Sequence, residues 1–269
     1  MTVPAFRFAP SPNGELHLGH AYSALLNERL AREAGGRFLV RIEDIDTVRC
    51  TSLLAAQALE DLEWLGLSWE TPVRYQSQHL ATYAAQQDRL KDLGLLYPCF
   101  CTRKQIAERS AGLDLDPEGQ PVYDGWCRVL TARVAQGRMA QGAAPAMRIN
   151  MAATYPQLPG SLVPGLRRWG DVVLVRKDIG TSYHIAVVAD DTLQNITHVV
   201  RGQDLEAATA IHILLQLLLG MPRPEYIHHN LISGETGEKL SKSKGSKSLR
   251  SLRAEGVTAG AIRRALGFS

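Results

Sequence analysis

Two spacings of hydrophobic residues alternate in the first 70 positions, and they predict alternating strands and helices. Short hydrophobic runs bounded by turn residues are typical of buried strands. In the longer segments the hydrophobic residues recur at helical spacing, as Leu26 and Leu30 do on one face. The expected strands are residues 6–10 and 37–44, and the expected helices are residues 21–36 and 51–67. This order is typical of an α/β fold with a parallel sheet.

The pattern changes in the second half of the chain. From residue 97 to about residue 165, Pro, Gly and acidic residues interrupt the periodicity, which predicts a loop-rich inserted subdomain. Residues 171–191 and 195–202 are rich in β-branched side chains, a composition that favours strands. The expected elements after them are a helix over 205–220, a strand over 225–232, a basic loop over 237–248 and a short helical tail from about 249.

Composition and charge exclude several classes of protein. The 269 residues are 45% hydrophobic and carry a formal net charge of +3, which does not by itself require a nucleic-acid partner. The longest apolar run, residues 210–220, is too short to cross a bilayer. The N-terminus lacks the layout of a secretory signal. We therefore expect a cytoplasmic protein with no membrane partner. Basic residues are concentrated in residues 238–253.

The motif HLGH, residues 17–20, stands where the Pro- and Gly-rich loop meets the first predicted helix. The N–H groups and the dipole at a helix N-terminus favour an anion, and phosphate is the obvious one. His17 and His20 are then candidate phosphate donors. The alternative is a helix start whose histidines only form hydrogen bonds with nearby backbone.

Three of the four cysteines are close together in sequence, at Cys99, Cys101 and Cys127. In a cytoplasmic chain this grouping favours a metal site over a disulfide framework. Buried thiols without a metal are the alternative. Cys50 stands apart and is most simply a structural thiol.

HLGH and the later KLSKS, residues 239–243, resemble the two signature motifs of class I aminoacyl-tRNA synthetases. The resemblance implies a Rossmann-like catalytic domain that binds ATP with Mg²⁺. His17 and His20 would donate to the phosphates, Gly19 would leave room for adenine, and Lys239 and Lys242 would close over pyrophosphate. The alternative for KLSKS is a solvated basic linker.

Within that family the chain is similar to the glutamyl branch, in the segments RFAPSPNGELHLGHAYSALLNERLA, LVRIEDID and ITHVVRGQDL. The resemblance implies a glutamate pocket lined by Arg7, Ala9, Ser11, Glu43, Tyr183 and Arg201. A dicarboxylate with one ammonium group needs two cations and one carboxylate, which Arg7, Arg201 and Glu43 supply. Ordinary ion pairs are the alternative for each of the three. Val187 departs from the family, which often has a side-chain amide there.

The resemblance also assigns the cysteines. Cys99, Cys101, Tyr123 and Cys127 are similar to the zinc ligands in the acceptor-binding insertion of this family. Four protein ligands leave no open position, so the Zn²⁺ would be structural. The expected division is therefore a catalytic domain over 1–96 and 166–230, a zinc-bearing insertion over 97–165, and the KLSKS loop with a short helical tail over 231–269.

The chain ends at Ser269, with no region resembling the anticodon-binding domain of glutamyl-tRNA synthetases. This layout is similar to truncated paralogs that activate glutamate and attach it to queuosine in the anticodon of tRNA(Asp). The expected partners are glutamate, ATP and that anticodon stem-loop, gripped in part by basic residues such as Lys247 and Arg250, and we expect a monomer. The alternatives are a catalytic fragment that charges a 3′ terminal adenosine, a catalytically idle tRNA-binding paralog, and another nucleotidyltransferase with an H-x-G-H loop.

Overall fold

The computed structural model describes residues 3–110, 114–232 and 247–268. The chain folds as two units. The first comprises Met1–His79, Leu193–Glu206 and Pro224–Ser269, and the second comprises Leu80–Thr192 and Ala207–Arg223. The predicted insertion over 97–165 lies within the second unit. Lys239 and Lys242 lie outside the described residues.

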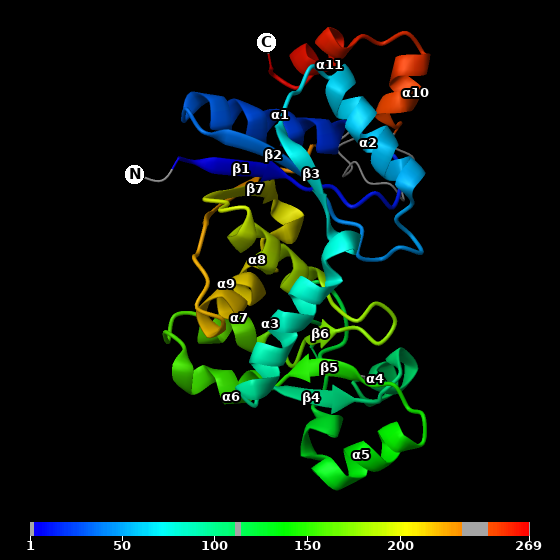
Figure 1. Cartoon of the computed structure of the whole chain (residues 1–269), viewed down its shortest axis with the longest axis vertical. Helices are drawn as coiled ribbons and strands as arrows, with labels where there is room; N and C mark the ends of the chain where they lie inside the picture. The colour runs from blue at the N-terminus through cyan, green and yellow to red at the C-terminus, as the bar shows by residue number, and fades with distance from the viewer. Residues whose placement is uncertain (1–2, 111–113, 233–246, 269) are drawn as a thin grey trace. The chain divides into compact units, whose positions relative to one another are not determined.

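A five-stranded sheet organises the first unit, in the order β3-β2-β1-β7-β8 (Figure 1). Every neighbouring pair is parallel, which confirms the predicted α/β fold with a parallel sheet. The strands are β1 (Ala5–Phe8), β2 (Arg37–Ile42), β3 (Glu70–Tyr75), β7 (His198–Gly202) and β8 (Glu225–His229). The helices α1 (Leu18–Glu33) and α2 (Ser52–Trp64) connect the first three strands. Because β2 and β7 flank β1 on its two sides, the strand order reverses at β1, where open α/β sheets bind ligands.

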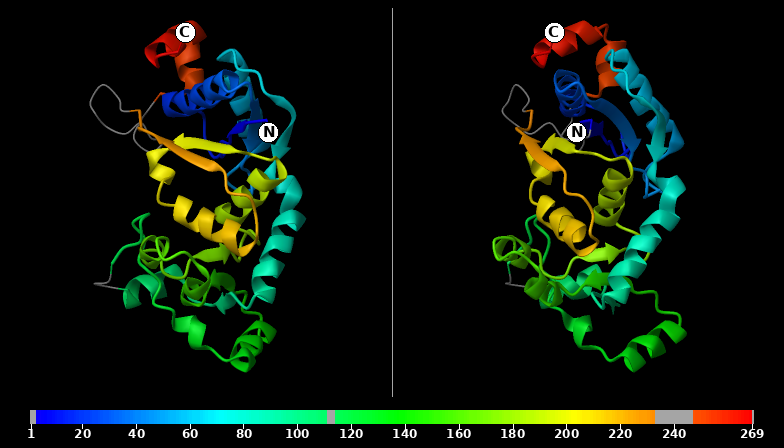
Figure 2. Two further views of the ribbon diagram at one scale, coloured as in Figure 1. Left: turned by 90° about the vertical axis from the view of Figure 1, so that its left-hand side faces the viewer. Right: turned by 60° about the vertical axis from the view of Figure 1, so that its left-hand side comes forward.

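The two faces of this sheet carry different side chains. Phe6, Phe8 and Val200 pack with α1 in one hydrophobic cluster, whereas Ala5 and Val199 belong to a second cluster. Successive residues of a strand point to opposite faces, so each strand contributes to both clusters. Figure 2 shows β7 in yellow and β8 in orange side by side, in agreement with their pairing.

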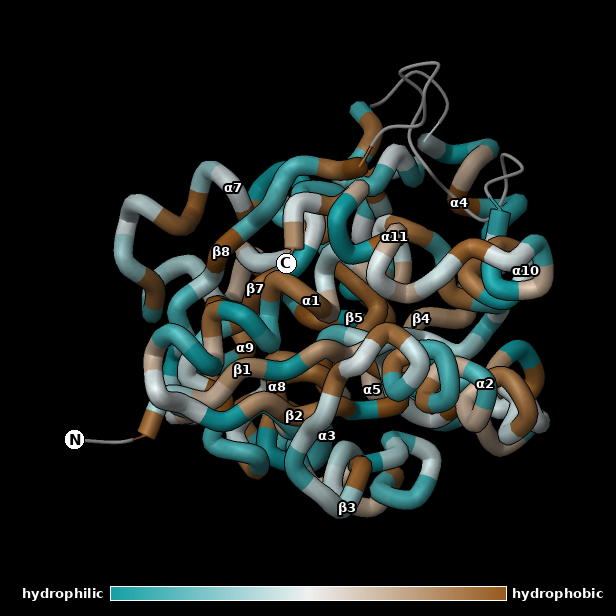
Figure 3. Tube along the Cα trace, turned by 90° about the horizontal axis from the view of Figure 1, so that it is seen from above, coloured by the Kyte–Doolittle hydropathy of each residue, from teal (hydrophilic) through white to brown (hydrophobic). Residues whose placement is uncertain are grey.

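The C-terminal tail is helical, as predicted. It consists of α10 (Leu249–Ala254) and α11 (Ala259–Ala265), capped by Ser248 and Thr258. Leu249, Ile262 and Phe268 join the cluster that contains α1. Figure 3 shows how hydrophobic and hydrophilic residues alternate along α2, another helix of that cluster.

An antiparallel sheet with the order β4-β5-β6 lies in the second unit. Its strands are β4 (Leu96–Cys99), β5 (Ala146–Ile149) and β6 (Val173–Val175). The helices of this unit are α3 (Leu80–Asp92), α4 (Arg103–Arg109), α5 (Ala132–Ala140), α6 (Met151–Thr154), α7 (Val163–Arg167), α8 (Tyr183–Leu193) and α9 (Thr209–Leu218). Short 3-10 turns occur in both units: η1 (Gln76–His79) and η4 (Gln203–Leu205) in the first, and η2 (Trp126–Val129) and η3 (Tyr155–Gln157) in the second.

Residues 171–191 were expected to form strands because they are rich in β-branched side chains, and most of them do not. Only Val173–Val175 is a strand, and Tyr183–Leu193 is the helix α8. Ile185 to Ala189 are all buried, so burial on more than one side of a helix explains the continuous hydrophobic run. Among the described residues, no helix has both the length and the apolar character to span a membrane.

Candidate active site

The HLGH motif forms the N-terminus of α1. His17 is the N-cap residue, and its Nδ1 accepts a hydrogen bond of 3.1 Å from the Gly19 backbone N–H. The His20 Nδ1 accepts one of 3.1 Å from the His17 N–H, which completes a capping box. An accepting Nδ1 carries no proton, so in each neutral ring the proton is on Nε2. The backbone contacts and the predicted phosphate role therefore use different ring nitrogens and do not exclude each other.

Gly19 has a steric reason to be glycine. A Cβ atom at this position would lie 3.0 Å from Cε1 and 3.1 Å from Nδ1 of the His17 ring. Such a contact is tighter than ordinary van der Waals packing, so the His17 ring would have to shift by a few tenths of an ångström. The geometry therefore ties Gly19 to the position of His17, while its predicted contact with adenine stays a prediction.

The residues that follow the KLSKS motif lie beside HLGH. Leu249 donates a backbone hydrogen bond of 2.8 Å to the Leu16 carbonyl, and Ser248 forms an antiparallel bridge with His17. The start of α10 is thus fixed against the start of α1, more than 200 residues earlier in the chain. Two of the predicted RNA-gripping cations are already paired, because Lys247 contacts Glu255 at 2.7 Å and Arg250 contacts Glu60 at 2.8 Å.

Three of the predicted pocket residues come from neighbouring strands. Arg7 is on β1, Glu43 follows β2, and Arg201 is on β7. Arg7 alternates with Phe6 and Phe8, and Arg201 follows Val200, so both arginines project from the face opposite α1. Each is only 4% exposed. Burial this deep excludes ordinary surface ion pairs for both arginines.

Arg41 is a further charged residue, and the sequence analysis did not identify it. It is fully buried on β2 and donates hydrogen bonds to the Glu43 carboxylate at 3.1 Å and to the Gln194 side-chain oxygen at 3.0 Å. Glu43 is therefore part of an ion pair, but a buried one. The signal that could have revealed Arg41 is its place within the run RFLVRI, where strand alternation puts it on the same face as Leu39.

The loops after β1 and β2 are joined to each other. The Glu43 backbone N–H donates to the Pro10 carbonyl at 3.0 Å. Cys50 lies 3.5 Å from the Ser11 hydroxyl, and its thiol contacts the Glu43 carbonyl at 3.9 Å. Ala9, half-buried, and Ser11, exposed, are on the first of these loops. The contacts fix Ser11 and Glu43 relative to one another.

Tyr183 belongs to the second unit, where it begins α8. Its ring meets the His212 ring edge-on, with 5.4 Å between the ring centres. Val187, the position that departs from the family pattern, is buried on the same helix.

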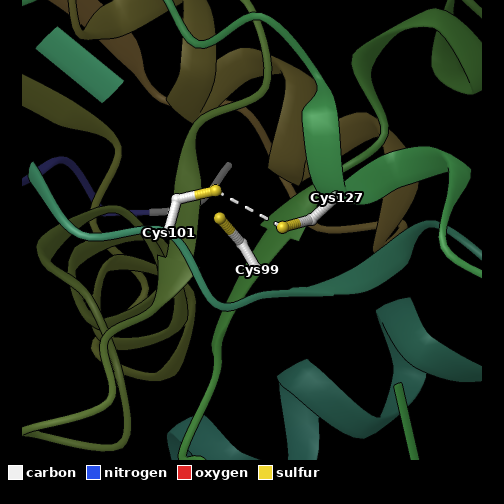
Figure 4. A group of neighbouring side chains, drawn as sticks. All are labelled: Cys99, Cys101 and Cys127. Atoms are coloured by element: carbon white, nitrogen blue, oxygen red, sulfur yellow. Dashed lines mark hydrogen bonds between the residues drawn. The ribbon is translucent and has the colours of Figure 1, made fainter. Parts of the chain in front are cut away.

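The predicted metal ligands converge in the second unit. Cys99 ends β4, Cys101 follows it, and Cys127 lies in η2; their three sulfur atoms lie within 4.8 Å of one another (Figure 4). The Cys101 and Cys127 sulfurs are 3.4 Å apart. The Tyr123 hydroxyl is 3.6 Å from the Cys101 sulfur and accepts a hydrogen bond of 2.8 Å from the Cys127 N–H. All four cysteines lie in described residues, and none forms a disulfide.

These four groups fit a tetrahedral metal ion. Zn–S bonds of about 2.3 Å place tetrahedral sulfurs about 3.8 Å apart, which is compatible with three thiols that lie within 4.8 Å of one another. Burial raises the pKa of the Tyr123 hydroxyl, and its hydrogen bonds to the three cysteines raise it further. Burial also opposes ionisation of Cys99, but hydrogen bonds from the side chains of Tyr123 and Arg148 leave the pKa of that thiol below its ordinary value.

Comparisons with known proteins agree with this geometry. The family described as "tRNA synthetases class I (E and Q), catalytic domain" matches residues 5–268. The chain belongs to this family, so it is an ATP-dependent ligase of the aminoacyl-tRNA synthetase type.

Two relatives and one solved structure make the likeness more specific. The "Glutamyl-Q tRNA(Asp) synthetase" of Rhodobacter capsulatus is 45% identical over 97% of this chain and 99% of the relative. A protein of the same name from Symbiobacterium thermophilum is 42% identical over 94% and 82% of the two chains. The solved glutamate-tRNA synthetase of Elizabethkingia anophelis has a TM-score of 0.75 and 27% identity, and the match covers 91% of this chain and 53% of that one.

Proposed function

We propose that this protein activates glutamate with ATP and transfers the glutamyl group to queuosine in the anticodon of tRNA(Asp). The observation that carries the proposal is the set of charged groups at neighbouring strands of a parallel sheet, Arg7, Glu43 and Arg201, in the unit that holds the HLGH helix start. The likeness to relatives of about the same length that bear the name glutamyl-Q tRNA(Asp) synthetase supports it.

In the first step, a glutamate carboxylate oxygen forms a bond to the α-phosphorus of ATP. The bond from that phosphorus to the bridging oxygen breaks, and pyrophosphate leaves with the electron pair. His17 and His20 would donate Nε2–H hydrogen bonds to the phosphates, where negative charge develops. By the family resemblance, Gly19 would face adenine and Lys239 and Lys242 would bind pyrophosphate, with Mg²⁺ accompanying ATP.

The amino-acid pocket would use Arg7 and Arg201 for the two carboxylates of glutamate and Glu43 for its ammonium group. Arg41 keeps the Glu43 carboxylate in place by its hydrogen bond of 3.1 Å. Ala9, Ser11 and Tyr183 would complete the lining, as the resemblance implies.

The cysteine cluster would hold a structural Zn²⁺ through Cys99, Cys101, Cys127 and Tyr123. Its support is the convergence of three thiols and one hydroxyl, the number of ligands that a structural Zn²⁺ takes. Such an ion would brace the insertion over 97–165, because zinc binding contributes directly to the folding of its site.

In the second step the acceptor takes the glutamyl group and AMP leaves. Lys247 and Arg250 beside α10 would contact RNA phosphates, because their ion pairs with Glu255 and Glu60 are exposed and contribute little stability. Phosphate contacts carry no sequence information, so selectivity would depend on unstacked bases of one RNA loop, which is the usual basis of sequence-specific RNA binding. We propose a monomer that acts in the cytoplasm, where tRNA is found.

The test uses two anticodon stem-loops of tRNA(Asp) that differ only in carrying queuosine or guanosine, with radioactive glutamate and ATP. We expect the queuosine stem-loop alone to accept glutamate. Pyrophosphate exchange that depends on glutamate, measured without RNA, tests the first step separately. In a parallel reaction with an intact tRNA for glutamate, glutamate esterified to the 3′ terminal adenosine, with the queuosine stem-loop unmodified, would favour an ordinary glutamyl-tRNA synthetase fragment. No transfer and no exchange would favour an idle paralog.

A further inference from the structure

Two arginines contact the cysteine cluster from different elements. Arg109 is the last residue of α4, and its Nη2 donates a hydrogen bond of 2.8 Å to the Cys101 sulfur. The same guanidinium pairs with Asp124 at 3.1 Å and lies over the Trp126 ring at 5.1 Å. With Cys101 before α4 and Asp124 and Trp126 after it as partners, Arg109 has a fixed position beside the thiol.

Arg148 is on β5 and approaches the hydroxyl ligand. Its guanidinium carbon lies 4.0 Å from the centre of the Tyr123 ring, and its Nη1 donates a hydrogen bond of 2.6 Å to the Asp171 carbonyl. Its charge also acts on Cys99. Cys101 and Tyr123 therefore each have a cationic partner that is itself held in place.

The charge of the proposed centre explains why two cations are needed. Three thiolates, one phenolate and Zn²⁺ together carry a net charge of about −2. A buried charge is costly unless it is paired and hydrogen-bonded, and Cys99, Tyr123 and Cys127 are buried. The two guanidinium groups offset this charge in part; with the Asp124 carboxylate that pairs with Arg109, the total is about −1. Hydrogen bonds to ligand atoms also orient those ligands.

We propose that Arg109 and Arg148 are positioning residues that balance the charge of the metal centre and so set how tightly zinc is held. The inference rests on the proposed zinc site. It adds two residues whose role is separable from metal ligation, because neither of them would contact the ion.

The experiment measures the zinc affinity of the 269-residue chain by competition with a chromophoric chelator. Arg109→Gln and Arg148→Gln should each weaken zinc binding by roughly 10- to 100-fold, the usual effect of losing a partner of a metal ligand. Arg138→Gln is the matched control. Arg138 lies over the ring of Phe100 at 5.4 Å and does not contact a thiol. Phe100 stands between Cys99 and Cys101 in the sequence. We expect the control to bind zinc as the unaltered chain does.

Two further measurements separate charge from packing and from misfolding. Arg109→Lys and Arg148→Lys keep the charge but lose the planar group, so they should retain most of the affinity. The cobalt-substituted Gln variants should keep the thiolate-to-metal absorption of the unaltered protein, because the ligand set is unchanged. That spectrum also shows that the insertion has folded around the metal.

The outcomes distinguish the two proposals. If the unaltered chain takes up neither zinc nor cobalt, the metal site itself fails and the inference with it. If it binds zinc and the Gln variants bind as tightly as Arg138→Gln, the zinc site stands and the arginine role is overturned. If the Lys variants bind zinc as weakly as the Gln variants, charge balance is also overturned, and the planar shape of the guanidinium group explains the effect instead.

Discussion

Replacing Arg41 with methionine tests whether the buried arginine supports Glu43. The change preserves length and hydrophobic packing but removes the hydrogen bonds to Glu43 and to Gln194. Glu43, whose side chain is 10% exposed, would lose its ion pair with Arg41. Breaking a buried ion pair by removing one partner costs about 3–5 kcal/mol, so we expect a loss of that size in the free energy of unfolding.

The same strand offers a matched control. Arg37 forms a bidentate pair with Glu70 at 2.6 and 2.7 Å, but the two side chains are 37% and 46% exposed. Exposed pairs contribute about 0–1 kcal/mol, so Arg37→Met should have a small effect. Both variants are compared by urea unfolding followed by circular dichroism, and the first transition of each curve is fitted separately if the two units unfold apart.

A functional measurement accompanies the unfolding curves. If Glu43 binds the ammonium group of glutamate, Arg41→Met should raise the KM for glutamate in pyrophosphate exchange by roughly tenfold, whereas the KM for ATP changes little. Equal stability losses in the two variants would refute the claim that burial gives the Arg41 pair its importance. An unchanged KM for glutamate would refute the link from Arg41 through Glu43 to the amino acid.

Three other residues give sharp expectations. Asp61 on α2 is 1% exposed, and burial raises the pKa of its carboxyl from 3.8 to about 6. The positive charge of Arg250 lowers this pKa and the negative charge of Glu15 raises it, but burial has the larger effect. The native state therefore holds this proton more tightly than the unfolded state does, so the free energy of unfolding falls as the pH rises from about 4 to 6. Asp61→Asn should remove up to about 3 kcal/mol of that fall. Unfolding measurements at a series of pH values test this. Gly19→Ala should displace His17 and slow glutamate-dependent exchange with little change in melting temperature, and an unchanged rate would contradict the steric argument. Tyr123→Phe should weaken zinc binding less than replacing a cysteine ligand by serine does, because water can replace one oxygen ligand; chelator competition decides.

Much of the fold follows from local signals in the sequence. Strand and helix alternate in the first 70 residues with the spacings that each element requires, and the parallel sheet follows because a helix between two strands returns the chain in the same direction. The HLGH helix start was also predictable, since His17 caps α1 through contacts with residues two and three positions away. The cysteine cluster lies within a short span of the chain and was found by spacing alone.

Other features depended on contacts between distant residues. Residues 183–193 are rich in β-branched side chains yet form a helix, because a helix buried around its surface needs hydrophobic residues and tolerates their branching. Likewise the sequence does not show that Ser248 lies beside His17 or that β7 pairs with β1. Arg41, Arg109 and Arg148 look like ordinary surface arginines until the packing places each beside an anionic or ligand group. Local hydrogen bonds and periodicity are encoded by neighbours in the chain, whereas burial and charge pairing are properties of surfaces that meet only when the chain folds.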